Sequence, residues 1–339
     1  MSQKSERIAV IEQLRGIASL SVCWFHLTNQ YGDWVSRTGA LGWLGVEAFF
    51  VISGFVIPLS LALDWKTFGA RAVPGFLARR LIRIEPPYLI SILLVVGLNA
   101  LAALSPLFAG QAPTVPNAQI LLHAAYLIPF TEYEWLQPVY WTLAFEFLFY
   151  LVVGLCIPLF VSRRAGLLGW CYVVFLGVIA GGFVSPLFAL FGMGLLVFRA
   201  REDLDRPGLA TLGIALTAAA MVPGGAVAQA IVGSLTACII LLQRCSQGVP
   251  GLVGRVLDNL GKISFSLYLL HVPVGGKVVN LGQRWLTSPE EHFALSAIAL
   301  GTSLLAAAFF WRLVEQPCLK AAAALRARQR LAGPDQAVV

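Results

Sequence analysis

Charged side chains are scarce in this sequence. Of its 339 residues only 12% are Asp, Glu, Lys or Arg, whereas 58% are hydrophobic and the mean hydropathy is +0.79. A soluble globular domain carries about 25% charged residues, so this composition excludes that class. It predicts an all-α, polytopic membrane protein whose surroundings include membrane lipids.

Paired cysteines and acidic side chains are also scarce. None of the six cysteines forms a CxxC pair and most lie in apolar runs, so we interpret them as core residues and expect neither a disulfide framework nor a metal site. The net charge of +7 fits the positive-inside rule, and we expect no nucleic-acid partner. Glu12 interrupts the first apolar run and no small-residue cleavage site follows, which predicts that the first helix is retained. The cysteines are Cys23, Cys156, Cys171, Cys238, Cys245 and Cys318.

Ten apolar segments predict about ten transmembrane helices. With the N-terminus inside, most basic residues fall in inner segments and the outer loops keep Arg37 and Arg284, which indicates that both termini are cytoplasmic. We expect one membrane domain over residues 1–339, with spans within roughly 9–314 and a frayed, basic cytoplasmic tail at 315–339. The segments are 9–28, 41–63, 86–104, 139–161, 166–184, 186–200, 208–222, 226–243, 260–281 and 292–314.

Two proline-containing regions shape this prediction. Pro86 and Pro87 are expected to start the third span. Residues 105–138 contain a single short apolar run, which predicts a re-entrant or interfacial piece on the outer side, with His123 in a structural role.

The first span contains two polar groups that are costly inside a membrane. Arg15 and His26 are eleven residues apart, close to three helical turns, so both lie on one face of a helix about 16 Å apart. Such groups normally face a protein interior or a water-filled cavity and carry function. The alternative is a packed core histidine and a snorkelling arginine.

Other spans carry polar groups with two interpretations each. Glu146 lies in an apolar run and must pair with a cation or stay protonated, and Tyr150 shares its helical face. Ser53 and Gly54 lie in the middle of the second span, where glycine permits close approach of either a ligand or another helix.

An arginine cluster and a histidine complete the candidate residues. Arg79, Arg80 and Arg83 lie at the predicted inner face, where they either bind a phosphate-bearing ligand or only anchor the topology. Tyr268 and His271 are three residues apart on one helical face.

Six motifs occur here in the order seen in the acyltransferase 3 family, which the chain resembles from about residue 11 to residue 317. Departures from that pattern are Thr142, where serine is common, and Leu148, where glutamine is frequent. The motifs are LRGIA followed by His26, FFVISGF, RRLIRI, WTL-x-x-E followed by F-Y, ISFSLYLLH and VEQP.

The resemblance implies an integral membrane O-acyltransferase of the bacterial inner membrane. It would move an acyl group, usually acetyl, from cytoplasmic acyl-CoA (acetyl-CoA) to a hydroxyl of a carbohydrate or lipid-linked glycan, without a metal and in an oligomeric state that stays open. The implied catalytic residues are His26, as general base or transient acyl carrier, Arg15 and Glu146. The implied donor contacts are Arg79, Arg80, Arg83, Tyr150 and Ser53. The implied acceptor contacts are Tyr268, His271 and Trp141.

A transporter or flippase of a glycan or lipid is the alternative function. It would use Arg15, His26 and Glu146 as a proton relay. Transporters often contain inverted repeats, and this sequence shows no internal repeat.

Overall fold

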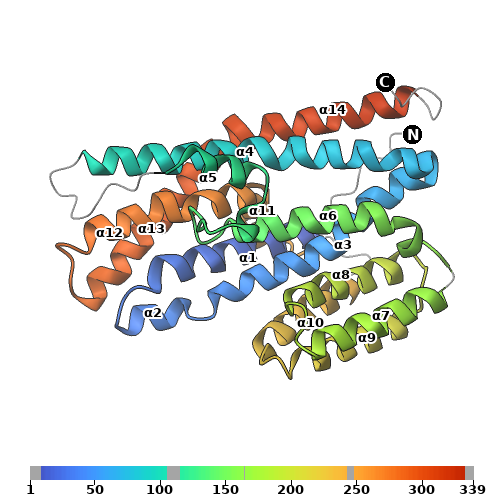
Figure 1. Ribbon diagram of the computed structural model, residues 1–339. Coiled ribbons are helices and arrows are strands. Elements are labelled where there is room, and N and C mark those ends of the chain that lie inside the picture. The colour runs from blue at the N-terminus through green and yellow to red at the C-terminus, as the bar shows by residue number, and fades with distance from the viewer. Residues whose placement is uncertain (1–8, 105–114, 164, 243–247, 333–339) are drawn as a thin grey trace. The chain divides into compact units, whose positions relative to one another are not determined.

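The computed structural model describes residues 9–104, 115–163, 165–242 and 248–332, and every regular element in these ranges is a helix (Figure 1). The predicted all-α class is therefore confirmed, and each of the ten predicted segments contains helix. Within the described ranges, three helical stretches are long and apolar enough to cross a membrane, namely Trp34–Ala103, Trp141–Phe160 and Pro289–Leu331. The number of ten spans and the orientation of the termini stay predictions.

Some predictions fall on residues outside the described ranges. These are Cys245, residues 105–114 of the outer segment and residues 333–339 of the tail. The five cysteines that the structure does describe are free.

The chain forms two compact units, and each is described by itself. Unit 1 comprises Met1–Val22, Leu41–Val73 and Tyr150–Ser264, and unit 2 comprises Cys23–Ala40, Pro74–Phe149 and Phe265–Val339. Four helices run from one unit into the other: α1 (Ala9–Thr28), α4 (Ala72–Ala103), α6 (Trp141–Phe160) and α11 (Gly251–Leu270).

Unit 1 is built around α8 (Leu187–Arg201), most of whose residues are buried. Glycines bring it against α3 (Gly45–Phe68), because a Cβ on Gly54 would lie 2.3 Å from the Phe191 carbonyl oxygen and one on Gly194 would lie 2.2 Å from the Val51 carbonyl oxygen. Small residues at such crossings let two backbones touch. Around α8 lie α7 (Ala165–Ala180), α9 (Pro207–Met221) and α10 (Val227–Leu242), with short 3₁₀ turns η1 (Gly42–Leu44) and η2 (Gly69–Arg71) flanking α3.

A buried arginine closes one end of unit 1. The Arg199 side chain is 1% exposed, and its guanidinium pairs with Asp205 at 2.5 and 2.9 Å. The same group donates to the carbonyl oxygens of Phe160 at 2.6 Å and Ser162 at 3.0 Å. These hydrogen bonds tie the ends of α6 and α8 together.

Unit 2 contains the remaining elements. Its longest helix after α4 is α13 (Pro289–Phe310), which begins with a capping box in which Ser288 and Glu291 satisfy each other's backbone N–H groups. The other elements are α2 (Trp34–Gly39), α5 (Asn117–Ala124), η3 (Ile128–Phe130), η4 (His271–Gly276), α12 (Lys277–Gly282), η5 (Trp311–Glu315) and α14 (Gln316–Ala332).

The structure corrects two expectations in this unit. Helix α4 runs through Pro86 and Pro87 rather than starting there, because the helix has already begun at Ala72 and the two rings remove only two of its hydrogen bonds. The described part of the tail does not fray: α14 is continuous and lies along α4, where Gln329 accepts a hydrogen bond from Arg79 (Figure 1).

The structural role predicted for His123 agrees with its contacts. The ring is fully buried, with Nδ1 2.8 Å from the Gln119 carbonyl oxygen. Nε2 accepts from the Leu136 N–H at 3.1 Å. Both nitrogens are used, which leaves none for a substrate.

Candidate functional site

Two histidines from distant parts of the chain meet in unit 2. His26 lies in the last turns of α1 and His271 opens η4, and their ring centroids are 5.2 Å apart. His271 Nδ1 lies 2.9 Å from the Leu267 carbonyl oxygen. A carbonyl only accepts, so Nδ1 carries the proton and Nε2 is left with a lone pair. Nε2 is buried and has no hydrogen-bond partner among the described residues, an arrangement that is costly unless it is used.

The backbone that begins at His271 is a π-helix, a form frequent at functional sites. Pro273 lies in its middle and cannot donate the hydrogen bond of a regular α-helix. Gly275 follows, and a Cβ there would lie 2.3 Å from Ser303 Oγ and 2.8 Å from Leu27 Cδ2. The absent side chain lets η4 pack against α13 and the end of α1, which places His271 beside His26.

Tyr268 lies beside His271. Its ring centroid is 6.0 Å from that of His271. Its hydroxyl lies 2.9 Å from Thr142 Oγ1 and donates to the Val139 carbonyl oxygen at 3.2 Å. The tyrosine thus ties the end of α11 to the start of α6, a contact made by the threonine that replaces the expected serine.

The other predicted residues of α6 share one helix. Trp141 packs edge-on against Phe145 with centroids 5.6 Å apart. Glu146 is half-buried and Tyr150 is buried one turn further on. The predicted pairing of Glu146 with Arg15 or His26 stays a prediction.

The predicted arginine cluster lies on the first turns of α4. Arg79 donates to Gln329 of α14, and the Arg80 guanidinium lies 5.5 Å from the centre of the Phe76 ring, a cation–π arrangement. Arg83 is half-buried one turn after Arg79. Neighbouring side chains thus hold two of the three arginines, Arg79 through Gln329 and Arg80 through Phe76.

Three predicted residues belong to unit 1, so their joint arrangement with the histidine pair stays a prediction. They are Arg15, Ser53 and Tyr150. For the glycine next to Ser53 the two interpretations can now be separated, since the carbonyl of Phe191 occupies the space beside Gly54. Close helix packing, rather than a ligand, explains that glycine.

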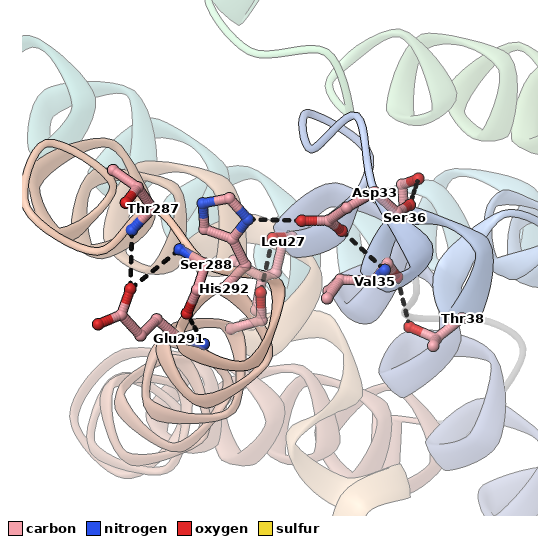
Figure 2. Close-up of polar contacts among 10 residues, drawn as sticks. Leu27, Asp33, Val35, Ser36, Thr38, Thr287, Ser288, Glu291 and His292 are labelled. Carbon is pink, nitrogen blue, oxygen red and sulfur yellow. Dashed lines mark hydrogen bonds and ion pairs between the residues drawn. The ribbon is translucent and has the colours of Figure 1, made fainter.

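A second polar cluster lies at the start of α13, and no motif or spacing in the sequence indicates it. Asp33 Oδ2 is 2.6 Å from His292 Nδ1, while Asp33 Oδ1 accepts from the Val35 N–H at 2.8 Å and so caps α2 (Figure 2). The hydrogen bond from His292 holds the pKa of Asp33 below its ordinary value. The two residues are 259 positions apart, and no motif links them.

A third group completes this cluster. The Tyr31 ring stacks on His292 with centroids 4.2 Å apart and 15° between the planes.

Groups of three or more His, Cys, Asp or Glu side chains able to hold a metal do not occur in the described part of the chain.

Comparisons with known proteins match the chain to one family model and to several relatives. A family model described as "Acyltransferase domain", of the acyltransferase 3 type, matches residues 8–312. The chain is 26% identical to acyltransferase MdmB of Streptomyces mycarofaciens over 94% of both proteins. It is 27% identical to nodulation protein 10 of Rhizobium leguminosarum bv. viciae, over 93% of this chain and 94% of that protein.

A shorter match involves a larger protein. It is 37% identical to a Staphylococcus aureus (strain COL) protein named "Putative O-acetyltransferase SACOL0978", over 28% of this chain and 14% of that protein. No solved structure matches the chain.

Proposed function

Because this chain belongs to the acyltransferase 3 family of membrane acyltransferases, we propose that it is a multi-pass O-acyltransferase of the bacterial inner membrane. It transfers an acetyl group from cytoplasmic acetyl-CoA to a hydroxyl of a carbohydrate or lipid-linked glycan. The names of the relatives support acyl transfer, and one of them includes O-acetyl transfer. The observation that carries the proposal is the pairing of His26 with His271.

The two imidazoles have different environments, which supports different roles. His271 is fully buried with its tautomer fixed by Leu267, whereas His26 is only half-buried. A general base must reach the proton that it removes. We therefore assign the base to His26 and a positioning role to His271. At 5.2 Å between ring centres, a small rotation lets His271 Nε2 accept a hydrogen bond from an N–H of His26.

The proposed step balances without a metal. The free nitrogen of His26 takes the proton of the acceptor hydroxyl while the acceptor oxygen bonds to the thioester carbonyl carbon. The C–S bond then breaks, and CoA leaves as a thiolate that takes the proton from the His26 imidazolium. An imidazole is suited to both transfers because it is neutral and basic near pH 7.

The arginines of α4 supply the second element of the proposal. Guanidinium groups bind phosphate bidentately, and CoA carries several phosphate groups. Changing Arg80 and Arg83 to Gln is expected to raise the KM for acetyl-CoA, with Arg71→Gln as the matched control at the same end of α4. An unchanged KM would reduce the cluster to a topology anchor.

The decisive experiment measures CoA release by the purified full-length protein in detergent. His26→Ala is expected to keep acetyl-CoA binding but to lower transfer at least ~10²-fold, the lower end of general-base contributions. Near-normal transfer by this variant would refute the assignment of the base. A wild-type protein that never releases CoA would instead favour the transporter, in which Arg15, His26 and Glu146 relay protons.

A further inference from the structure

The Asp33–His292 pair is partly accessible and held in a fixed geometry. The pair is mostly but not fully buried, since the Asp33 and His292 side chains are 19% and 16% exposed. A solvated ligand can therefore reach it. Its geometry is fixed from both sides, because Asp33 also caps α2 and His292 lies in the first turn of α13.

The pair retains unused hydrogen-bonding capacity. In Figure 2 one nitrogen of His292 is bonded to Asp33, and Nε2 has no partner among the described residues. Each oxygen of a carboxylate can accept two hydrogen bonds, so Asp33 can accept again after binding His292 and the Val35 N–H. Neighbouring acceptors of this kind match two adjacent hydroxyls of a sugar ring, each of which needs an acceptor for its proton.

Two aromatic rings form an exposed surface next to the pair. Trp34 and Phe293 each follow one member of the pair in sequence, and their rings stack with centroids 5.6 Å apart and 28° between the planes. They are 44% and 42% exposed. Trp24 supports Phe293 edge-on at 5.7 Å and is itself fixed by a 2.9 Å hydrogen bond from Nε1 to Thr38. The apolar face of a sugar ring, which carries only C–H groups, packs on such a surface.

This cluster is close to His26 along unit 2. Ser296, one helical turn after His292, donates a hydrogen bond at 3.2 Å to the carbonyl oxygen of Leu27, the residue next to His26. One turn of helix rises about 5.4 Å. Ser296 therefore joins the first turns of α13, which carry His292 and Phe293, to the last turn of α1, which carries His26.

We propose that Asp33, His292, Trp34 and Phe293 form a binding subsite for a pyranose ring of the acceptor, which holds that ring beside His26. This inference deepens the proposed function and rests on it, because only acyl transfer makes the bound sugar an acceptor. Anchoring of Trp34 in the membrane interface is the competing explanation for an exposed tryptophan. It gives no role to the Asp33–His292 pair, whose hydrogen bonds an anchor does not need.

The binding test uses the full-length protein in lauryldimethylamine oxide, a detergent without a sugar headgroup. Tryptophan fluorescence is titrated with methyl α-D-glucopyranoside, methyl α-D-galactopyranoside and methyl α-L-rhamnopyranoside, with the acyclic polyol sorbitol as control. We expect a saturable change with at least one glycoside and none with sorbitol. Trp34→Leu should abolish the change, whereas Trp285→Phe, at another exposed tryptophan of unit 2, should leave it intact.

Asp33→Asn isolates the charge. Asn caps helices as well as Asp does, so α2 is kept and thermal unfolding verifies the fold. Loss of a charge-assisted hydrogen bond should raise the Kd for the glycoside at least about tenfold. His292→Gln provides a second variant with the same expected result.

Failure of this inference can be told apart from failure of the proposed function. A wild-type protein that binds none of the three glycosides, or Asp33→Asn and Trp34→Leu variants that titrate like wild type, would overturn the subsite. A wild-type protein that binds a glycoside but never releases CoA would leave the subsite standing and refute acyl transfer.

Discussion

Replacing His271 with Leu separates positioning from stability. The change removes the hydrogen bond to the Leu267 carbonyl, worth about 1 kcal/mol. It also removes Nε2, a buried group without a partner among the described residues, whose desolvation costs about 1–3 kcal/mol. The side chains have similar volumes, so little strain is added. We expect the free energy of unfolding to stay unchanged or rise by up to about 2 kcal/mol, while acyl transfer is lost.

His123→Leu is the matched control for this prediction. Both nitrogens of His123 are bonded, so the same substitution breaks two hydrogen bonds and leaves the Leu136 N–H without its acceptor. The expected destabilisation is about 2–4 kcal/mol. Unfolding in detergent, followed by circular dichroism, measures both variants, and CoA release measures activity.

Two results would refute the reasoning about His271. Destabilisation by His271→Leu as large as that by His123→Leu would mean that Nε2 is satisfied in the folded protein. Full transfer by the variant would mean that His26 acts without a positioning partner.

Three further outcomes are expected. Arg199→Met should lower the free energy of unfolding by about 3–5 kcal/mol, because it leaves Asp205 without its cation; thermal denaturation measures this, and a change below about 1 kcal/mol would contradict the buried pair. Gly194→Ala should lower the melting temperature, since its Cβ would lie 2.2 Å from a carbonyl oxygen of α3, whereas Gly301→Ala, with nothing within 4 Å, should not. The depressed pKa of Asp33 implies that its bond to His292 stabilises the fold above pH 3.8 and that this contribution is lost as the pH falls below it. Between about pH 5 and pH 3 the melting temperature should therefore fall more steeply for wild type than for Asp33→Asn. An equal fall for both proteins would count against the bond.

The sequence by itself determined the helices and the family. Apolar runs bounded by Gly, Pro and charged residues are local signals, and the predicted span 9–28 coincides with α1. The prediction that a helix starts at Pro86 and Pro87 was wrong, because α4 begins at Ala72 and continues through both prolines. The motifs of the acyltransferase 3 type were also readable in order along the chain, and the family model matches over residues 8–312.

Only the tertiary structure decided which polar groups meet. His26 and His271 are far apart in sequence, and their contact depends on a π-helical turn and on the glycine at 275, which no periodicity predicts. The same holds for Asp33, the N-cap of α2, and His292, in the first turn of α13, which no motif links. Contacts between distant side chains depend on how the helices pack against one another. A sequence pattern predicts which face of a helix is buried but not which helix packs against that face.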